Sequence, residues 1–311
     1  MTACINTLAS SAAARPARAD KCWPEGPPSS RPRVHLSDED VLSITPANCS
    51  DLPDWAVFHT VSLGQDKPPP VLGPFLFAFL ATQCCSAELW IWTTSASLTR
   101  ERLLADFEIP KQHHHRIRVL PFDPAAQWRA LSGDAVFRDA IGPRRNGEKL
   151  IVGDYFKRAR PPNQADVARM LLLQRYGGTY VDLDALPMQD LRPLLAWRDA
   201  FAYRWSCSDK VNTALARWGS CGSNVSYEIT SAVIRTIDAK HVSHNAFYNS
   251  AAFKTLARLI ALPAWAGRFG IIPSALADPL WPRVQGQGCE PPSLAAFHPE
   301  MRNFEGYYAK R

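Results

Sequence analysis

The chain has 311 residues, of which 46% are hydrophobic and 21% are charged, a composition typical of a globular protein with a packed core. The 35 lysines and arginines exceed the 29 aspartates and glutamates by six, but no dense basic run with interleaved aromatics accompanies this charge, so we expect no nucleic-acid partner. No run of about twenty apolar residues is present, and the sequence therefore predicts no transmembrane helix.

The beginning of the chain differs in composition from the rest. Residues 1–53 are rich in proline, serine and arginine and show no sustained apolar periodicity, which is typical of a flexible segment. We therefore predict a flexible leader or stem over residues 1–53 and one folded domain over residues 54–311. Any membrane association would come through an N-terminal anchor missing from this sequence.

Strands and helices alternate through the first half of the predicted domain. The apolar run 55–63 and the segments 88–94 and 116–120 have the β-branched and aromatic content of strands, whereas 71–81 and 98–107 favour helices. A strand–helix rhythm of this kind is typical of an α/β fold with a mostly parallel central sheet flanked by helices.

The clearest local pattern is a helix followed by a strand. Asn163 is a candidate N-cap, with Asp166 three residues later, and the apolar face that follows carries the helix to about Tyr176. Glycines 177–178 end the helix, since glycine adopts the left-handed conformation without steric cost. Residues 179–183 are β-branched and aromatic, and they predict a strand.

Two aspartates, Asp182 and Asp184, stand at the end of that strand. Side chains at i and i+2 of a strand point to one side, so both carboxylates would project together where open α/β sheets bind ligands. Adjacent carboxylates repel unless a cation lies between them, and Mn²⁺ or Mg²⁺ prefers such oxygens together with substrate phosphates. The spacing alone is not specific, since Asp38 and Asp40 in the predicted leader share it.

Asp166 and Arg169 form a second candidate pair, three residues apart on one face of the predicted helix. An ordinary ion pair is one interpretation. The other is that Asp166 accepts hydrogen bonds from sugar hydroxyls, while Arg169 holds the aspartate or a sugar oxygen by a forked contact.

Several other residues leave alternatives open. Trp90 and Trp92 share one strand face, where they would pack in the core or stack on a base. The run 113–115 consists of three histidines, which we interpret as a solvated loop rather than a metal site because adjacent side chains do not converge on one ion. The eight cysteines contain no C-x-x-C pair, which argues against a structural zinc, and we favour a disulfide between Cys207 and Cys221.

The segment from Ala165 to Asp184, ADVARMLLLQRYGGTYVDLD, resembles the DXD-motif sugar-binding region of glycosyltransferase family 32, which includes α-1,4-galactosyltransferase-like and initiating α-mannosyltransferase-like enzymes. The family pattern reads roughly Ser-Asp-x-x-Arg, an apolar helix, then Tyr/Phe-Gly-Gly-x-Tyr-x-Asp-x-Asp. The resemblance implies a GT-A-type nucleotide-sugar-binding fold. It also implies a metal-dependent enzyme, in a Golgi or other secretory membrane, that moves a hexosyl group from a nucleotide-sugar to a hydroxyl acceptor.

The resemblance further implies a role for each matching residue. Asp166 and Arg169 would contact the donor sugar, Asp182 and Asp184 the ribose and the metal-bound diphosphate, and Tyr180 would wall the site. We assign Asp166, Asp182 and Asp184 as catalytic. The donor would be a UDP-sugar bound with Mn²⁺ or Mg²⁺, the acceptor a glycan, glycolipid or glycoprotein, and the anomeric configuration would be retained.

The segment at Asn245, Asn-Ala-Phe, resembles a family turn near the donor, so Asn245 joins the predicted donor site. Three features depart from the pattern: Ala165 replaces the usual serine, no late His-x-Trp-Asn motif follows, and the predicted leader lacks the usual signal anchor. Two alternatives therefore stay open, a catalytically impaired nucleotide-sugar-binding homologue and a metal-dependent phosphohydrolase that uses the same acids.

Overall fold

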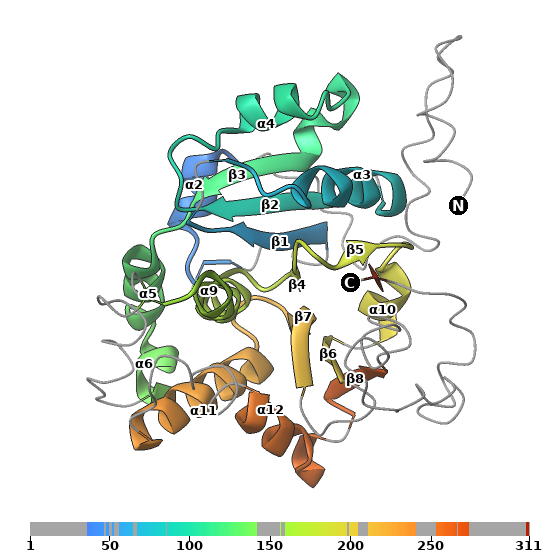
Figure 1. Ribbon diagram of the computed structural model, residues 1–311. Coiled ribbons are helices and arrows are strands. Elements are labelled where there is room, and N and C mark those ends of the chain that lie inside the picture. Colours follow the sequence, from blue (N-terminus) through green and yellow to red (C-terminus); the bar gives the residue numbers. More distant parts are fainter. Residues whose placement is uncertain are drawn as a thin grey trace.

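A seven-stranded sheet forms the centre of the computed structural model, with helices on both of its faces (Figure 1). Its strands are β1 (Val57–Ser62), β2 (Glu88–Thr93), β3 (Ile117–Pro121), β4 (Thr179–Val181), β6 (Ala200–Arg204), β7 (Val211–Trp218) and β8 (Phe269–Pro273). A separate pair joins β5 (Leu186–Pro187) to β9 (Ala309–Lys310). The structure describes residues 36–46, 48–49, 52, 56–64, 67–84, 86–141, 156, 159–197, 199–204, 211–240, 253–265, 267–273 and 309–310.

The strand order is β3-β2-β1-β4-β7-β6-β8, and the sheet is mixed. The first four strands of this order run parallel, β7 is antiparallel to both β4 and β6, and β8 is parallel to β6. The prediction of a mostly parallel sheet flanked by helices is thus confirmed, and the first three strands begin within two residues of the predicted positions. The antiparallel β7 has a consequence for the site: Val181, the last residue of β4, pairs with Leu215, so the first residues of β7 lie beside the segment that follows β4.

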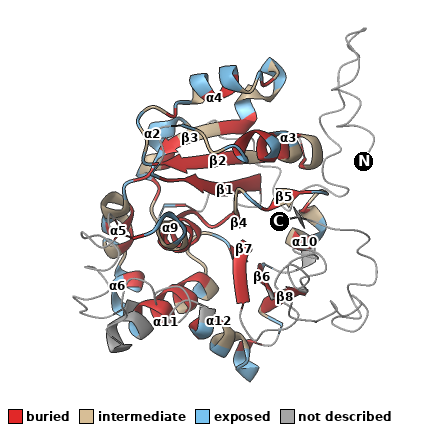
Figure 2. Cartoon of the chain, viewed as in Figure 1, coloured by how far each residue is buried: buried red, intermediate tan, exposed pale blue. Residues whose placement is uncertain are grey.

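Helices cover the sheet as two apolar layers. One layer contains α3 (Leu72–Thr82), α4 (Arg100–Asp106) and α10 (Arg192–Trp197). The other contains α2 (Asp38–Ser43), α5 (Pro124–Ser132), α6 (Ala135–Ile141), α9 (Pro161–Tyr176), α11 (Asn224–Lys240) and α12 (Phe253–Ile260). Figure 2 shows the strands buried between these layers. None of the helices in the described part of the chain is both long and apolar enough to cross a bilayer.

The tryptophans of β2 belong to the core. Trp90 is 1% exposed and Trp92 is 0% exposed, so packing, rather than stacking on a base, is their role. The histidine run 113–115 falls in a short 3-10 helix, Lys111–Arg116, rather than in a loop, and the His114 ring is hydrogen-bonded to the Ile109 carbonyl. Among the described residues, no group of three histidine, cysteine or acidic side chains is placed to hold a metal ion.

The prediction of a flexible leader over residues 1–53 is wrong for the segment that contains α2. Ser37 and Asp40 form a reciprocal capping box, in which the Ser37 hydroxyl accepts from the Asp40 backbone N–H and the Asp40 carboxylate accepts from the Ser37 N–H. Val41 is fully buried, and Arg175 of α9 donates to the Leu42 and Ile44 carbonyls. The acid-x-acid spacing in this segment therefore serves a helix start.

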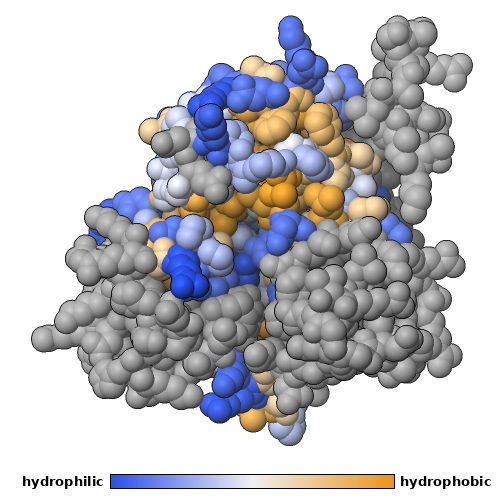
Figure 3. Space-filling model, in the orientation of Figure 1, coloured by the Kyte–Doolittle hydropathy of each residue, from blue (hydrophilic) through white to orange (hydrophobic). Residues whose placement is uncertain are grey.

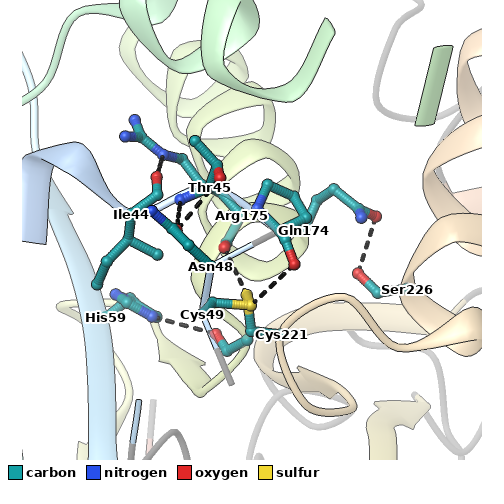
Figure 4. Close-up of a disulfide and its surroundings, with 11 residues drawn as sticks. Ile44, Thr45, Asn48, Cys49, His59, Gln174, Arg175, Cys221 and Ser226 are labelled. Atoms are coloured by element: carbon teal, nitrogen blue, oxygen red, sulfur yellow. Dashed lines mark hydrogen bonds between the residues drawn. A yellow bond between two sulfur atoms is a disulfide. The ribbon is translucent and has the colours of Figure 1, made fainter. Parts of the chain in front are cut away.

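The disulfide prediction is also wrong. Cys221 pairs with Cys49, 172 residues away, and not with Cys207, which lies outside the described residues (Figure 4). The bond joins the segment after α2 to the turn before α11. Closeness in sequence misled the prediction because the fold, and not the chain separation, brings two cysteines to bonding distance.

One face of the molecule carries exposed apolar side chains. Figure 3 shows them gathered across the middle of the view, in the region of α3. Val71, which precedes α3, is 42% exposed, and Phe77 within it is 48% exposed. Val71 also borders the cavity described next.

Candidate active site

Helix α9 begins three residues before its predicted start. Pro161 and Pro162 occupy its first positions, with Arg160 as N-cap in an extended conformation. Proline suits this first turn because its φ is already helical and its missing N–H would have no partner there. The prediction of Asn163 as N-cap is therefore wrong, and Asn163 instead lies in the first turn, against the cavity.

The predicted glycine stop of α9 is confirmed. Gly177 has φ +65° and Gly178 has φ +75°, the left-handed region that disfavours other residues. A Cβ on Gly178 would lie 2.8 Å from the Val57 carbonyl oxygen and 2.9 Å from His59 Nε2. The chain thus turns sharply and enters β4 in close contact with β1.

Asp182 and Asp184 lie in a turn, not in the strand. Strand β4 ends at Val181, and the Ala185 N–H donates to the Asp182 carbonyl at 2.9 Å, which closes a four-residue turn. The strand prediction for 179–183 is therefore too long, and strand alternation does not explain the pair. The turn still brings both side chains to one cavity, where that of Asp182 is 18% exposed and that of Asp184 is exposed.

This cavity has a volume of about 430 Å³ and lies where β1 and β4 end and β7 begins. Pockets for small ligands typically measure ~300–1,000 Å³. Apolar walls come mainly from the end of β1, from Pro69 and Val71, and from the two prolines of α9. The charged and amide side chains in the lining are those of Asn163, Asp166, Arg169, Asp182, Asp184 and Asn212.

Arg169 joins the helix half of the cavity to the strand half. Its Nη2 lies 2.7 Å from Asp182 Oδ1, and its Nη1 lies 3.4 Å from Asp166 Oδ1 and donates to the Thr213 hydroxyl. The guanidinium also stacks 4.4 Å from the centre of the Tyr180 ring. Since the Arg169 side chain is only 4% exposed, water screens these attractions weakly. One buried cation therefore orients two carboxylates.

Tyr180 is the buried floor beneath that cation. Burial, followed by the negative charge of Asp182, raises the pKa of the Tyr180 phenol well above its usual value, while Arg169 partly offsets the rise. The phenol therefore stays neutral at any physiological pH and acts as a wall and a hydrogen-bonding group, not as an anion.

The structure brings five predicted site residues to the lining of one cavity: Asp166, Arg169, Tyr180, Asp182 and Asp184. The sixth, Asn245, lies outside the described residues. Asn212 and Thr213, near the start of β7, were not predicted as site residues. Asn212 lines the cavity, with its amide oxygen accepting from the Ala214 N–H at 2.7 Å. The signal in the sequence was an Asn-Thr pair near the start of a mostly apolar strand.

The two aspartates of the turn suit a hard divalent cation. Such ions bind carboxylate oxygens and, in the case of Mg²⁺, take only one or two carboxylates and complete their shell with water and substrate phosphates. Asp182 Oδ1 is bound by Arg169, and the side chain of Asp184 is exposed. A cation bound here would therefore be coordinated partly by these carboxylates and partly by oxygen atoms of the substrate.

Comparisons with known proteins identify this segment. Residues 76–201 match the family model described as "Glycosyltransferase sugar-binding region containing DXD motif", and these residues include all five of the predicted site residues that line the cavity. No curated protein matches the chain in sequence.

Solved structures of glycosyltransferases are similar in fold to the chain. The PaToxG glycosyltransferase is 10% identical, with a TM-score of 0.46 over 72% of this chain and 74% of that one. The galactosyltransferase LgtC, in complex with donor and acceptor sugar analogues, is 11% identical, with a TM-score of 0.46 over 82% and 86%. Mouse xyloside xylosyltransferase 1 is 11% identical, with a TM-score of 0.41 over 81% and 96%.

The sequence match spans α3 to the start of β6 and includes the turn with both aspartates. Residues 76–201 are therefore similar to a DXD-motif glycosyltransferase sugar-binding region, and they lie within a mixed seven-stranded sheet flanked by helices.

Proposed function

We propose that the chain transfers a hexosyl group from a UDP-sugar to a hydroxyl acceptor, with retention of anomeric configuration and with Mn²⁺ or Mg²⁺ as cofactor. The observation that supports this most is the single cavity wall on which Asp166, Arg169, Asp182 and Asp184 meet, inside the DXD-motif region. The UDP donor and the retention come from the family resemblance.

Each side chain has a distinct part in donor binding. Asp182 and Asp184 would hold the cation, which when bound would neutralise charge on the departing diphosphate. Asp166 would accept hydrogen bonds from sugar hydroxyls, since its carboxylate borders the cavity and is held by Arg169. Arg169 would keep both of its carboxylate partners oriented, because its own side chain is held by Thr213.

The test is a screen for nucleoside-diphosphate release from UDP- and GDP-sugars in the presence of Mn²⁺. The wild type should turn over a UDP-sugar best. Asp182→Asn and Asp184→Asn should each lower the rate by at least about 10-fold, since loss of even an outer partner of a metal ligand typically costs about 10–100-fold. The matched control is Asp106→Asn, an acid on the surface of α4 whose side chain is 46% exposed and which should leave the rate unchanged.

Other outcomes decide between the alternatives. Unchanged turnover in both aspartate variants would overturn the proposed mechanism. Titration calorimetry that shows UDP and Mn²⁺ binding, with turnover at background, would identify a catalytically impaired homologue. Release of free phosphate rather than a nucleoside diphosphate would identify a phosphohydrolase.

We also propose that the chain works in an oxidising compartment of the secretory pathway, such as the Golgi, on a glycan, glycolipid or glycoprotein acceptor. The disulfide between Cys49 and Cys221 supports this location, since such bonds form and persist in oxidising compartments. Peptide mapping under non-reducing conditions, on protein isolated from its own cells, should recover the Cys49–Cys221 cross-link. Recovery of both cysteines as thiols would contradict the location.

A further inference from the structure

His59 lies in the middle of β1, outside the cavity lining, and is completely buried. Its ring is surrounded by the aromatic side chains of Trp90, Trp92 and Tyr176, at centroid distances of 5.4, 6.2 and 5.9 Å. Its two nitrogens are both hydrogen-bonded: the indole N–H of Trp92 is 3.1 Å from Nδ1, and the Gly177 carbonyl oxygen is 3.1 Å from Nε2.

These two partners determine the tautomer of the ring. An indole N–H can only donate, so His59 Nδ1 must be the unprotonated acceptor. Nε2 then carries the single ring proton and donates it to the Gly177 carbonyl. Burial lowers the pKa of His59 to about 3, which keeps this neutral form in place throughout the physiological range.

The carbonyl that His59 holds belongs to the corner between α9 and β4. Helix α9 carries Asp166 and Arg169 before the corner, and Asp182 follows β4 after it. Only Gly178 and the three residues of β4 separate Gly177 from Asp182 along the chain. A shift of the corner would therefore move the two halves of the site relative to each other and strain the 2.7 Å contact from Arg169 to Asp182.

Two contacts show that the corner rests directly on the His59 ring. The ring binds the Gly177 carbonyl, and it lies so close to Gly178 that a Cβ there would come within 2.9 Å of Nε2. In addition, the His59 backbone is paired with Tyr180 in the sheet, so the same residue aligns the strand that carries the floor of the cavity. Ring and backbone together locate the start and the middle of β4.

We propose that His59 is a positioning residue for the donor site, which acts by fixing the Gly177–Gly178 corner and, through it, the register of Asp182 against Arg169. The effect of His59 on donor binding rests on the proposed function. The geometric part, restraint of the corner, holds independently of any ligand, and it can be measured separately.

The experiment compares two substitutions of His59. His59→Gln keeps a donor at about the reach of Nε2, whereas His59→Leu removes both hydrogen bonds. The control for general core damage is Leu103→Ala, on α4, a fully buried site in the opposite apolar layer. Each protein is examined by thermal unfolding, by amide hydrogen exchange of the peptide that covers 177–182, and by calorimetric titration with UDP and Mn²⁺.

The expected result separates positioning from stability. His59→Leu should speed exchange in the 177–182 peptide and weaken UDP–Mn²⁺ binding by about 10–100-fold, the usual effect of losing a supporting contact behind a ligand site. His59→Gln should restore binding to within about threefold of wild type, which is a shift of less than one kilocalorie per mole. Leu103→Ala should unfold at lower temperature without change in exchange at 177–182 or in affinity.

Two failures can be told apart. If the wild type does not bind UDP with Mn²⁺, the proposed function fails, and the exchange data alone decide whether His59 restrains the corner. If the wild type binds and His59→Leu binds equally well, or if Leu103→Ala weakens binding as much as His59→Leu does, the positioning role is overturned.

Discussion

The buried, neutral His59 should make the folded chain sensitive to acid. Burial lowers the pKa of its imidazole from 6.5 to about 3, against a smaller opposite effect of the Gly177 carbonyl. Between these two values the unfolded chain binds a proton that the folded chain does not. The contribution of His59 to stability is therefore fully present above pH 6.5 and is lost as the pH falls towards 3.

The size of the loss follows from linkage. One proton bound only by the unfolded state costs about 1.4 kcal/mol of folding free energy for each pH unit below the unfolded pKa. Lowering the pH from 7 to 5 should thus remove about 2 kcal/mol through His59 alone. This is a large share of the roughly 5–15 kcal/mol that stabilises a typical domain.

Urea unfolding of wild type and His59→Gln at pH 7, 6 and 5, under non-reducing conditions, isolates this effect. Both proteins share every carboxylate and every other histidine, so their contributions cancel in the difference between the two free energies of unfolding. That difference should move by about 2 kcal/mol in disfavour of the wild type between pH 7 and 5. A difference that does not change with pH would refute the argument that the folded imidazole stays unprotonated.

Three further predictions concern the corner, the disulfide and the aspartate pair. Gly178→Ala should cost about 1–3 kcal/mol through its positive φ and more through its clash, so it should destabilise more than Gly267→Ala, which has a positive φ and open space around it; equal losses in urea unfolding would contradict the close approach. Cys49→Ala should lower the free energy of unfolding by about 2–5 kcal/mol, measured as a drop in melting temperature. Reductant should lower the melting temperature of the wild type in the same way and leave that of Cys49→Ala unchanged. Asp182→Asn should cost about 1–3 kcal/mol by weakening a buried charged hydrogen bond, whereas Asp184→Asn, at an exposed position, should leave thermal stability unchanged; equal melting temperatures for the two variants would show that Asp182 carries no structural load.

The fold was predictable where local patterns act alone. Sequence patterns predicted strands β1, β2 and β3 and the glycine stop after α9. Strand periodicity and left-handed φ values depend on only a few neighbouring residues, so they can be recognised locally. The start of α9 was missed although its signal is equally local. The prediction began the helix after Asn163, whereas Pro161 and Pro162 are residues that suit a first helical turn.

The N-terminal segment shows what local patterns leave out. Helix α2 has only six residues, too few for a visible period, and it is stabilised mainly by partners far along the chain. Arg175 binds its last carbonyls, and Cys49 bonds to Cys221, so the evidence for its order lies more than 130 residues away in sequence. Composition therefore predicted a flexible leader, whereas the segment that contains α2 packs against the domain.

The candidate site divides in the same way. Asp166, Arg169 and the aspartate pair lie within 20 residues of one another, so a motif could indicate them together. Asn212 lines the same cavity and Thr213 accepts from Arg169 because β7 runs antiparallel to β4, and strand direction is a tertiary property. Their polar side chains could be read from the sequence, but their place beside Arg169 could not.

Strand alternation also treats Asp182 and Asp184 as equivalent, and the structure shows that they are not. The turn that follows β4 places the first against the buried guanidinium of Arg169 and leaves the second exposed. The first carboxylate must therefore serve two partners, the arginine that links it to α9 and any cation in the cavity. Occupancy of the cavity would thus be coupled to the contact that joins helix and strand, which is why the corner held by His59 matters to a site that His59 does not touch.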